Sequence, residues 1–424
     1  MDELVIDGMS AAGEGIGRLA DGRVLFVANT VPGDRVRVRL GERRQRVQYA
    51  DLVEVLDPSA LRVRSRCTVD ACGGCALKVV SNAGQADLKR RRVLDALRRI
   101  GGFDVATLNP TLVQVGDGWR YRHRVRLHAY HLGHRFELGY YAAKSHTLVP
   151  LAGCPVLWRE LEATANTLAT ALATVPREVH LVSVELAHSL KDARTAAVLN
   201  VNGDVELLRH SLNWIDAAGL SGVAVVGHSQ SWRHGNLTLR YDHGRADDYT
   251  LWFEPDLFTQ AFPQVNDALV AAAMRALNPA AGMRILEFHA GLGNFTIPLS
   301  LSGATVTAVE QSRRSAILGR RNLKAAGVSA MLLERADHDA LGLLAEADRV
   351  LLDPPRTGAR ALAEAMATNG PEQVAYVSCD PATLARDARI LAAGGYAIKS
   401  LELFDMFPET PHVESLLVMQ RGTP

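Results

Sequence analysis

Residues 283–296 read MRILEFHAGLGNFT, and this stretch decides the fold of the carboxyl-terminal part of the chain. Its apolar first half, MRILEFHA, predicts a buried strand. Its second half, GLGNFT, predicts a tight turn that leads into a helix, where the backbone can approach a ligand closely and the helix start offers free N–H groups. The glycine spacing is not GxGxxG, and no Lys-Ser or Lys-Thr pair follows, which excludes a phosphate-binding P-loop.

The same alternation of strand and helix continues on the carboxyl-terminal side. Further strands are predicted in ATVTAVE (304–310), RVLLDPP (349–355) and QVAYVSC (373–379), with helices such as ALAEAMATN (361–369) and TLARDARILAAGG (383–395) between them. This pattern predicts a mostly parallel sheet with helices on both faces, an α/β Rossmann-like domain over residues 251–424. Glu310 ends the second strand, where a carboxylate can accept both hydroxyls of a ribose. A glycine-rich first turn with an acid after strand two is shared by dinucleotide and S-adenosylmethionine sites.

Two chemically active side chains end later strands of this sheet. Asp353 is followed by two prolines, which fix the chain and leave the carboxylate at the ligand edge, although a helix-capping role would fit the same pattern. Cys379 lies before Asp-Pro in a turn, which favours an accessible thiol over a small buried filler. A thiolate beside a methyl donor suits one chemistry in particular, addition to carbon 6 of a pyrimidine so that carbon 5 becomes nucleophilic. The required base would come from His412 or Glu414, just before the last apolar strand.

The amino-terminal quarter has a different character. Residues 1–58 alternate short apolar runs with glycine turns, which predicts a small β-barrel of the oligonucleotide-binding kind. Residues 1–99 carry 18 Lys and Arg against 13 Asp and Glu, a net charge of +5 that hints at a polyanionic partner. The basic side chains of the barrel form a predicted stripe that is either a solvated face or a phosphate-tracking surface: Arg35, Arg37, Arg39, Arg43, Arg44 and Arg46.

The middle of the chain, residues 59–250, is predicted to be mainly β, with a helix at 156–175 and another near 204–212. An earlier helix, 85–100, should turn its basic residues outward and its apolar residues inward. No run of about 18 apolar residues occurs and the amino terminus lacks a signal region, so we expect a cytoplasmic protein without a membrane span.

Cysteine use points to metal ligation or catalysis, because an odd total of five in such a chain does not suit a disulfide framework. Cys67, Cys72 and Cys75 lie on one compact glycine-containing loop, and Cys154 is a remote fourth. Four thiolates suit either tetrahedral zinc or a [4Fe–4S] cluster, and spacing alone does not decide between them.

Several motifs together resemble the RNA uracil-5-methyltransferase family: FPQVN (262–266), GLGNFT (291–296), LLDPPRTG (351–358), YVSCDPATLARD (376–387) and DMFPETPHVES (405–415). The resemblance extends over the chain, because residues 1–58 look like a TRAM-type barrel and the four other cysteines look like that family's iron–sulfur site. It therefore implies three parts: a TRAM-type RNA-binding barrel (1–58), a central β-rich RNA-binding domain with a [4Fe–4S] cluster (59–250), and an S-adenosylmethionine-dependent methyltransferase domain (251–424).

The resemblance also assigns roles. It makes Cys379 the nucleophile and Glu414 the base that takes the proton from carbon 5, with His412 as local support for Glu414. It implies that Phe262 contacts the target nucleotide. It places Gln264 and Asp353 where cofactor and uracil meet. The other residues that it places at the cofactor are Phe288, Asn294, Glu310 and Asp337. One departure is Glu287, which stands where the family commonly has an aspartate.

The family pattern favours a [4Fe–4S] cluster over zinc at the four cysteines. It also favours 23S rRNA over the tRNA T-loop as the substrate. We expect the enzyme to be a monomer. Rival functions fit the sequence less well. A radical S-adenosylmethionine enzyme usually has a C-x3-C-x2-C loop, whereas the first spacing here is four. A non-catalytic RNA-binding protein would not need Cys379 and Glu414. A cytosine-5 methyltransferase usually has a Pro-Cys motif nearer strand four, and here that strand ends in DPPR.

Overall fold

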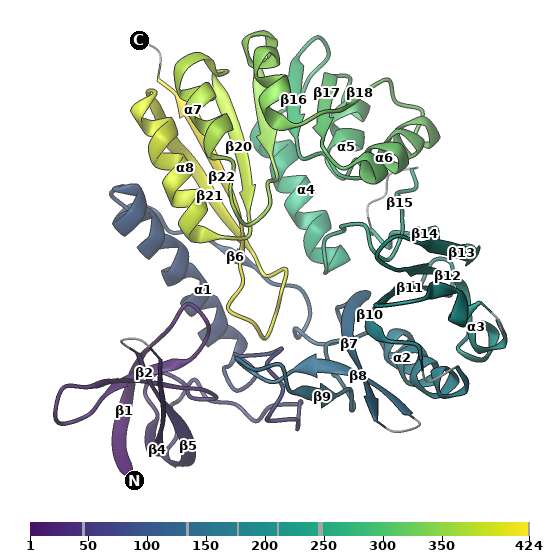
Figure 1. The fold of residues 1–424 in the computed structure, drawn as a ribbon. Helices are drawn as coiled ribbons and strands as arrows, with labels where there is room; N and C mark the ends of the chain where they lie inside the picture. Colours follow the sequence, from purple (N-terminus) through teal and green to yellow (C-terminus); the bar gives the residue numbers. More distant parts are fainter. Residues whose placement is uncertain (45–46, 133–134, 176–177, 210–211, 245–248, 423–424) are drawn as a thin grey trace.

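The structure, a computed structural model, describes residues 1–44, 47–132, 135–175, 178–209, 212–244 and 249–422. A small barrel and a central sheet lie on one side of the molecule, and a large α/β sheet lies on the other (Figure 1). Within the described ranges, no helix is long and apolar enough to cross a membrane.

The amino-terminal strands close into the predicted barrel, in the order β1-β2-β3-β5-β4. Alternate residues such as Leu25 and Val36 point inward and form its core, as period-2 patterning requires. Three arginines of the predicted stripe, Arg35, Arg37 and Arg39, lie on its outside and pair with carboxylates of neighbouring strands. Arg37 contacts both Glu3 (2.9 Å) and Glu54 (2.6 Å). Arg46 and the side chain of Arg44 lie outside the described part. The strands are β1 (Asp2–Met9), β2 (Gly15–Arg18), β3 (Val24–Val27), β4 (Arg35–Arg44) and β5 (Val47–Asp57).

The central region is a seven-stranded sheet in the order β13-β12-β11-β10-β7-β8-β9. Apolar side chains of the sheet pack against the helices in one continuous core that includes Leu127, Leu168 and Trp214. The strands are β7 (Arg124–Leu132), β8 (Arg135–Tyr141), β9 (Leu148–Pro150), β10 (Leu181–Ser189), β11 (Arg194–Val201), β12 (Leu220–Val226) and β13 (Ser231–Gly235). The helical elements are α2 (Arg159–Ala171), η2 (Leu172–Thr174), η3 (Val205–Leu208) and α3 (Asn213–Ala217). A separate pair, β14 (Leu239–Arg240) and β15 (Trp252–Phe253), leads to the α/β sheet.

One segment of the middle of the chain lies against the α/β sheet rather than in the central sheet. It comprises α1 (Asn82–Ala96), the π-helical turn η1 (Leu97–Gly101) and the short strand β6 (Leu112–Val113). Val93 and Leu97 enter the core of the α/β domain, and β6 pairs in parallel with β21 at the sheet edge. The prediction that all basic residues of this helix face outward is wrong for Lys89, which is 1% exposed, and apolar Ile100 is exposed instead of buried.

The α/β domain has the predicted parallel sheet, in the order β18-β17-β16-β19-β20-β22-β21-β6. Two apolar cores, one on each face, explain why its strands are almost continuously hydrophobic. The strands are β16 (Arg284–Phe288), β17 (Thr305–Glu310), β18 (Met331–Glu334), β19 (Arg349–Leu352), β20 (Gln373–Ser378), β21 (Tyr396–Phe404) and β22 (Glu414–Arg421). The helices are α4 (Pro263–Leu277), α5 (Thr296–Leu301), α6 (Arg313–Ala325), η4 (Asp337–Glu346), α7 (Arg360–Asn369) and α8 (Pro381–Ala393).

The direction of β22 determines what gathers at the ligand edge. Strands β16 to β20 are parallel, so their carboxyl ends meet at one edge. Strand β22 is antiparallel to β20, with Ser378 opposite Ser415, so the amino end of β22 reaches that same edge. The first residue of β22 therefore lies beside the residue that follows β20.

Candidate active site

A cavity of about 560 Å³ lies at this edge of the α/β sheet. It is bounded by the ends of four strands, by the loop before β22 and by the segment that connects β15 to α4. Its wall consists of Asp256, Leu257, Phe258, Gln260, His289, Gly291, Glu310, Ser312, Ser315, Asp353, Pro354, Pro355, Arg356, Cys379, Phe407, His412 and Glu414. The structure thus brings Cys379, Glu414, Asp353 and Glu310 into one space, although they come from distant parts of the sequence.

Cys379 lies directly after β20, in the turn before α8. Asp380 caps that helix, because its Oδ1 accepts the N–H groups of Ala382 (2.9 Å) and Thr383 (3.0 Å). The turn leaves the Cys379 thiol half-buried in the cavity wall. Burial, followed by the nearby Glu414 carboxyl, raises the pKa of Cys379 to about 11, while Arg356 acts in the opposite direction. The thiol is therefore neutral until a change in its surroundings favours the thiolate.

Glu414 is the first residue of β22 and is 3% exposed. Burial raises the pKa of its carboxyl well above the usual value, and the charge of Asp353 adds to this effect. Such a carboxyl can hold a proton near neutral pH and exchange it with a substrate, which is the property a general acid or base needs.

Arg356 is the cation that faces these acidic groups. It lowers the pKa values of both Cys379 and Glu414, so it favours the charged forms of nucleophile and base. It also lies 3.5 Å from the His412 ring nitrogen Nε2. Burial and then Arg356 lower the pKa of His412 to about 4, so this ring is neutral and can accept a hydrogen bond from the guanidinium. No role was assigned to Arg356 from the sequence, although the DPPR motif that contains it ends a strand at the ligand edge.

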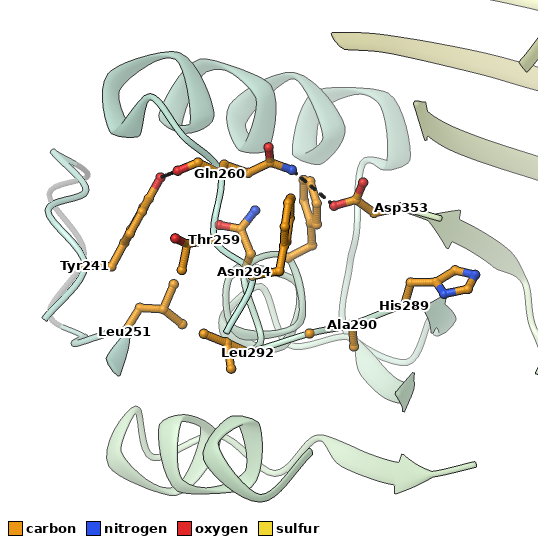
Figure 2. Close-up of a pocket in the computed structure, with 12 residues that line it drawn as sticks. Tyr241, Leu251, Thr259, Gln260, His289, Ala290, Leu292, Asn294 and Asp353 are labelled. Atoms are coloured by element: carbon orange, nitrogen blue, oxygen red, sulfur yellow. Dashed lines mark hydrogen bonds between the residues drawn. The ribbon is translucent and has the colours of Figure 1, made fainter. Parts of the chain in front are cut away.

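Asp353 connects the thiol side of the cavity with its cofactor side. Figure 2 shows the Gln260 amide directed at the Asp353 carboxylate, with Nε2 donating to Oδ2 at 3.4 Å. The backbone carbonyl of Gln260 is itself held by the Tyr241 hydroxyl at 3.0 Å. Burial raises the pKa of Asp353 to about 6, against the opposing charge of His289. Gln260 was not singled out from the sequence, because it precedes the recognisable FPQVN motif.

The turn after β16 forms the cofactor side of the cavity. Gly291 (φ 57°) and Gly293 (φ 95°) adopt left-handed conformations, which glycine takes at no steric cost. Glu310 fixes this turn, because its Oε2 accepts the Gly291 N–H (2.8 Å) while its Oε1 accepts the Ser312 N–H (2.6 Å). Asn294 lines an adjoining small cavity of about 40 Å³ and exchanges two amide hydrogen bonds with Asn266 (2.9 and 3.0 Å).

Three predicted cofactor residues are not part of the described walls of these two cavities. Gln264 is exposed on the first turn of α4, and Phe288 is fully buried in the core on one face of the sheet. Asp337 lies behind the cavity, with a carboxylate oxygen 3.1 Å from Nε2 of His289. His289, the residue after Phe288, is the one that reaches both cavities.

Of two phenylalanines near the cavity, the one expected to contact the target nucleotide, Phe262, is buried, and Phe258 is exposed instead. Phe262 is 6% exposed and stacks on Tyr121, with ring centroids 5.1 Å apart. Phe258, four residues earlier, is 64% exposed and lines both cavities. Phe258 therefore offers an exposed aromatic surface to an entering base, and no motif in the sequence pointed to it.

The four remaining cysteines meet around a separate cavity of about 30 Å³. All four are free thiols, and the wall of this cavity also contains two cationic side chains, Lys78 and Arg122. Nε of buried Arg122 has no hydrogen-bond partner in the described part of the chain. Burial and the neighbouring thiols raise the pKa of Cys75 to about 12. Among the described residues, no group of three or more potential ligands is spaced to hold a metal ion.

The main cavity combines a thiol, a buried carboxyl and an arginine next to a glycine turn stabilised by Glu310. This arrangement suits nucleophilic addition by Cys379, charge stabilisation by Arg356 and proton removal by Glu414, all on one planar substrate.

Comparisons with known proteins agree with this chemistry. Residues 343–422 match the tRNA (Uracil-5-)-methyltransferase family, and residues 3–53 match the TRAM domain. Full-length relatives include proteins named 23S rRNA (uracil(1939)-C(5))-methyltransferase RlmD. The one from Halomonas elongata is 36% identical, covering 99% of this chain and 89% of its own. The one from Shewanella baltica (strain OS223) is 33% identical, covering 98% and 95%.

A solved structure has the same overall fold. It is the Pyrococcus abyssi tRNA (uracil-54, C5)-methyltransferase in complex with S-adenosyl-L-homocysteine, which is 22% identical. The superposition has a TM-score of 0.77 and covers 98% of this chain and 99% of the other. The predicted methyltransferase fold and the amino-terminal TRAM barrel are thereby confirmed.

Proposed function

The chain belongs to the uracil-5-methyltransferase family of RNA-modifying enzymes, and from this premise we propose that it methylates carbon 5 of a uridine in 23S rRNA. The observation that carries the proposal is the cavity in which Cys379, Glu414 and Arg356 lie together at the end of a methyltransferase sheet. Bound S-adenosylmethionine supplies the methyl group as an electrophilic sulfonium.

The residues of the chain divide the reaction into two halves. In the first half, the Cys379 thiol gives its proton to solvent and the sulfur bonds to carbon 6 of uracil as the double bond between carbons 5 and 6 opens. Carbon 5 gains the electron pair and takes the methyl group. In the second half, the Glu414 carboxylate removes the proton from carbon 5, the double bond between carbons 5 and 6 re-forms, and the bond to sulfur breaks. Arg356 stabilises the charged forms of both residues. We assign to Asp353, in the wall of the same cavity, a hydrogen bond to the edge of the base.

The test compares Cys379→Ala and Glu414→Gln with wild-type protein on an rRNA fragment. We expect Cys379→Ala to form neither 5-methyluridine nor a covalent adduct. Glu414→Gln should accumulate a protein–RNA adduct that survives denaturing electrophoresis, because the second half of the reaction stops. Glu402→Gln is the matched control, since Glu402 pairs with Arg275 away from the cavity (3.1 Å) and should leave turnover unchanged. Normal turnover by Glu414→Gln would rule out Glu414 as the base.

The choice of RNA is supported by the named relatives, which act on 23S rRNA according to their names, whereas the Pyrococcus protein is named for tRNA. The tRNA T-loop is accordingly the second candidate. Mapping 5-methyluridine in rRNA and tRNA from cells with and without the protein distinguishes them. Formation of S-adenosylhomocysteine rather than 5′-deoxyadenosine would separate either reaction from radical chemistry. On ribosomal RNA the enzyme would work in the cytoplasm, and its action as a monomer stays a prediction.

Cofactor contacts are proposed for the residues that line the cavities, Glu310, Asn294 and Asp353. Glu310 is suited to a ribose because its carboxylate stands at the end of β17 beside the glycine turn. Contacts from Gln264, Phe288 and Asp337 stay predictions.

We further propose that Cys67, Cys72, Cys75 and Cys154 hold a [4Fe–4S] cluster. Support comes from the cavity that the four thiols share and from the two cationic side chains in its wall, Lys78 and Arg122, which suit an anionic cluster. Iron, sulfide and zinc analysis of protein purified without oxygen tests this. Stoichiometric zinc without iron would favour the tetrahedral alternative, and Cys75→Ser should lower the metal content in either case.

A further inference from the structure

The connection between β21 and β22, residues 405–413, precedes Glu414 and contributes Phe407 and His412 to the cavity wall. Its conformation is not one that the chain adopts readily by itself. Glu409 has a left-handed backbone (φ 65°), which is unfavourable for a residue with a side chain. Contacts from outside this connection must therefore hold it, and five of its hydrogen bonds come from α1, more than 300 residues earlier in the sequence. Figure 1 shows α1 running from the barrel along the α/β domain.

Gln85 holds the strained residue of the connection. Its Oε1 accepts the backbone N–H of Glu409 (3.0 Å), and its Nε2 donates to the Glu409 carboxyl (3.2 Å). The Glu409 carbonyl accepts the N–H of Leu77, between the cysteine loop and α1 (2.9 Å). Backbone and side chain of Glu409 are thus both fixed by the amino-terminal part of the molecule.

Lys89 holds the start of the connection. Its ammonium group is buried at 1% exposure, forms an ion pair with buried Asp405, and donates to the carbonyl of Phe407 (3.1 Å). Gln114 donates to the other oxygen of Asp405 (3.1 Å). A lysine is rarely buried without a specific partner, because removing its charge from water is costly. The position of Asp405 is therefore tied to that of Lys89.

Arg92 holds the end of the connection. Its guanidinium donates to the carbonyl of Pro411 (2.6 Å), three residues before Glu414. The contacts of Gln85, Lys89 and Arg92 follow the spacing i, i+4, i+7, which places the three side chains on one face of α1. Two other arginines of the same helix, Arg90 and Arg91, pair instead with Asp87 on the helix itself (2.8 and 2.7 Å).

We propose that Gln85, Lys89 and Arg92 are positioning residues that fix residues 405–413 and thereby place the Glu414 carboxyl at carbon 5 of the substrate. The inference rests on the proposed function and adds a role for α1 in its second half-reaction. The hydrogen bonds that Gln85, Lys89 and Arg92 make to the α/β domain go to residues 405–413 and not to Cys379, so adduct formation should depend on these residues much less than adduct resolution does.

The experiment is a single-turnover reaction with Lys89→Met, which keeps the length of the side chain but removes its charge and hydrogen bonds. We expect the adduct to form at nearly the wild-type rate and to resolve more slowly, on the order of tenfold or more, so that it accumulates on denaturing gels. Gln85→Leu and Arg92→Met should likewise slow adduct resolution more than adduct formation. Arg91→Met is the matched control on the exposed face of α1 and should behave as wild type.

Lost stability is separated from lost positioning by the double variant Lys89→Met/Asp405→Asn. Removing both charges avoids the penalty of an unpaired buried carboxylate, so its melting temperature should lie closer to wild type. The adduct should still accumulate, because the contacts to the connection are absent. The inference is overturned if the double variant resolves the adduct at the wild-type rate, or if the single variants slow formation and resolution equally. Wild-type protein that forms no 5-methyluridine would overturn the proposed function itself, and the inference with it.

Discussion

Cys379 and Glu414 face each other across two adjacent antiparallel strands: Cys379 follows the end of β20, and Glu414 begins β22. The pairing of Ser378 with Ser415 fixes this register, and a shift by one residue would turn the Glu414 side chain to the other face of the sheet. The backbone hydrogen bonds of the sheet therefore bring the start of β22 next to the turn that carries Cys379, and the connection 405–413 leads into this point.

The charge of Arg356 should be measurable through the reactivity of the Cys379 thiol. Burial and Glu414 raise the pKa of this thiol to about 11, and Arg356 opposes them, so Arg356→Met should raise the pKa further. Because only the thiolate is alkylated, we expect iodoacetamide labelling below that pH to slow by about three- to tenfold. Mass spectrometry of the peptide that contains Cys379 separates it from the other cysteines. Asp353→Asn removes a negative charge and should accelerate labelling, whereas Arg356→Met should slow it. If both variants changed the labelling rate in the same direction, the electrostatic assignment would be refuted.

Glu287 should make the stability of the protein depend on pH. Burial raises the pKa of this carboxyl from its ordinary value of 4.5 to about 8, although the Thr296 hydroxyl donates a hydrogen bond to one of its oxygens at 2.7 Å. The folded protein thus keeps a proton that the unfolded chain releases, and stability falls as the pH rises through this window. Glu287→Gln is neutral at every pH. Its melting temperature should be close to that of the wild type near pH 5, and should exceed the wild-type value by a growing margin as the pH rises toward about 8. Thermal unfolding at several pH values checks this, and a constant difference would contradict it.

Phe258 should contribute to substrate capture rather than to stability. Its ring is 64% exposed at the mouth of the cavity, where an extruded base could stack on it. Stacking on an aromatic ring is worth about 1–3 kcal/mol per base, so Phe258→Ala should lower kcat/KM for RNA by about tenfold or more without lowering the melting temperature. Phe262→Ala is the opposite case, because Phe262 is buried against Tyr121 and its truncation should reduce stability by about 3–5 kcal/mol. A drop in melting temperature with Phe258→Ala would contradict this division of roles.

Glu310 should control cofactor affinity. Its two carboxylate oxygens accept the N–H groups of Gly291 and Ser312, so the residue both shapes the turn and presents charge to a ribose. We expect Glu310→Ala to weaken S-adenosylhomocysteine binding by about tenfold to a hundredfold, measured by calorimetry, with RNA affinity unchanged. Glu334→Gln is the control, because Glu334 ends the neighbouring strand β18 and pairs with Arg320 at the surface.

The sequence predicted the parts of the site that follow from strand order. Cys379, Asp353 and Glu310 end strands of a parallel sheet, and such ends must meet at one edge whatever the loops do. The choice of Glu414 over His412 as the base required the family resemblance, because nothing in this stretch reveals that β22 enters the sheet between β20 and β21. Phe288 illustrates the limit of strand patterning. Both faces of a parallel sheet are apolar, so the sequence does not tell which side chain at a strand end faces the ligand.

Lys89 shows why the remaining contacts could not be predicted. A basic residue in a helix with an apolar stripe is expected outside, and its partner Asp405 lies 316 residues away. Only the packing of α1 on the α/β domain turns this lysine inward. The paired arginines of the barrel were equally unpredictable, because cross-strand neighbours such as Glu3 and Arg37 depend on the register.

The strand β6 forms the edge of the methyltransferase sheet, and the helix α1 packs against its core. Both elements are encoded far upstream of the other strands of the sheet. The catalytic unit is consequently not a portable module. A fragment that starts at residue 251 would expose the edge of β21 and leave Asp405 without its lysine. Recombination that exchanged the RNA-binding part for another would have to carry α1 and β6 along with the methyltransferase sheet.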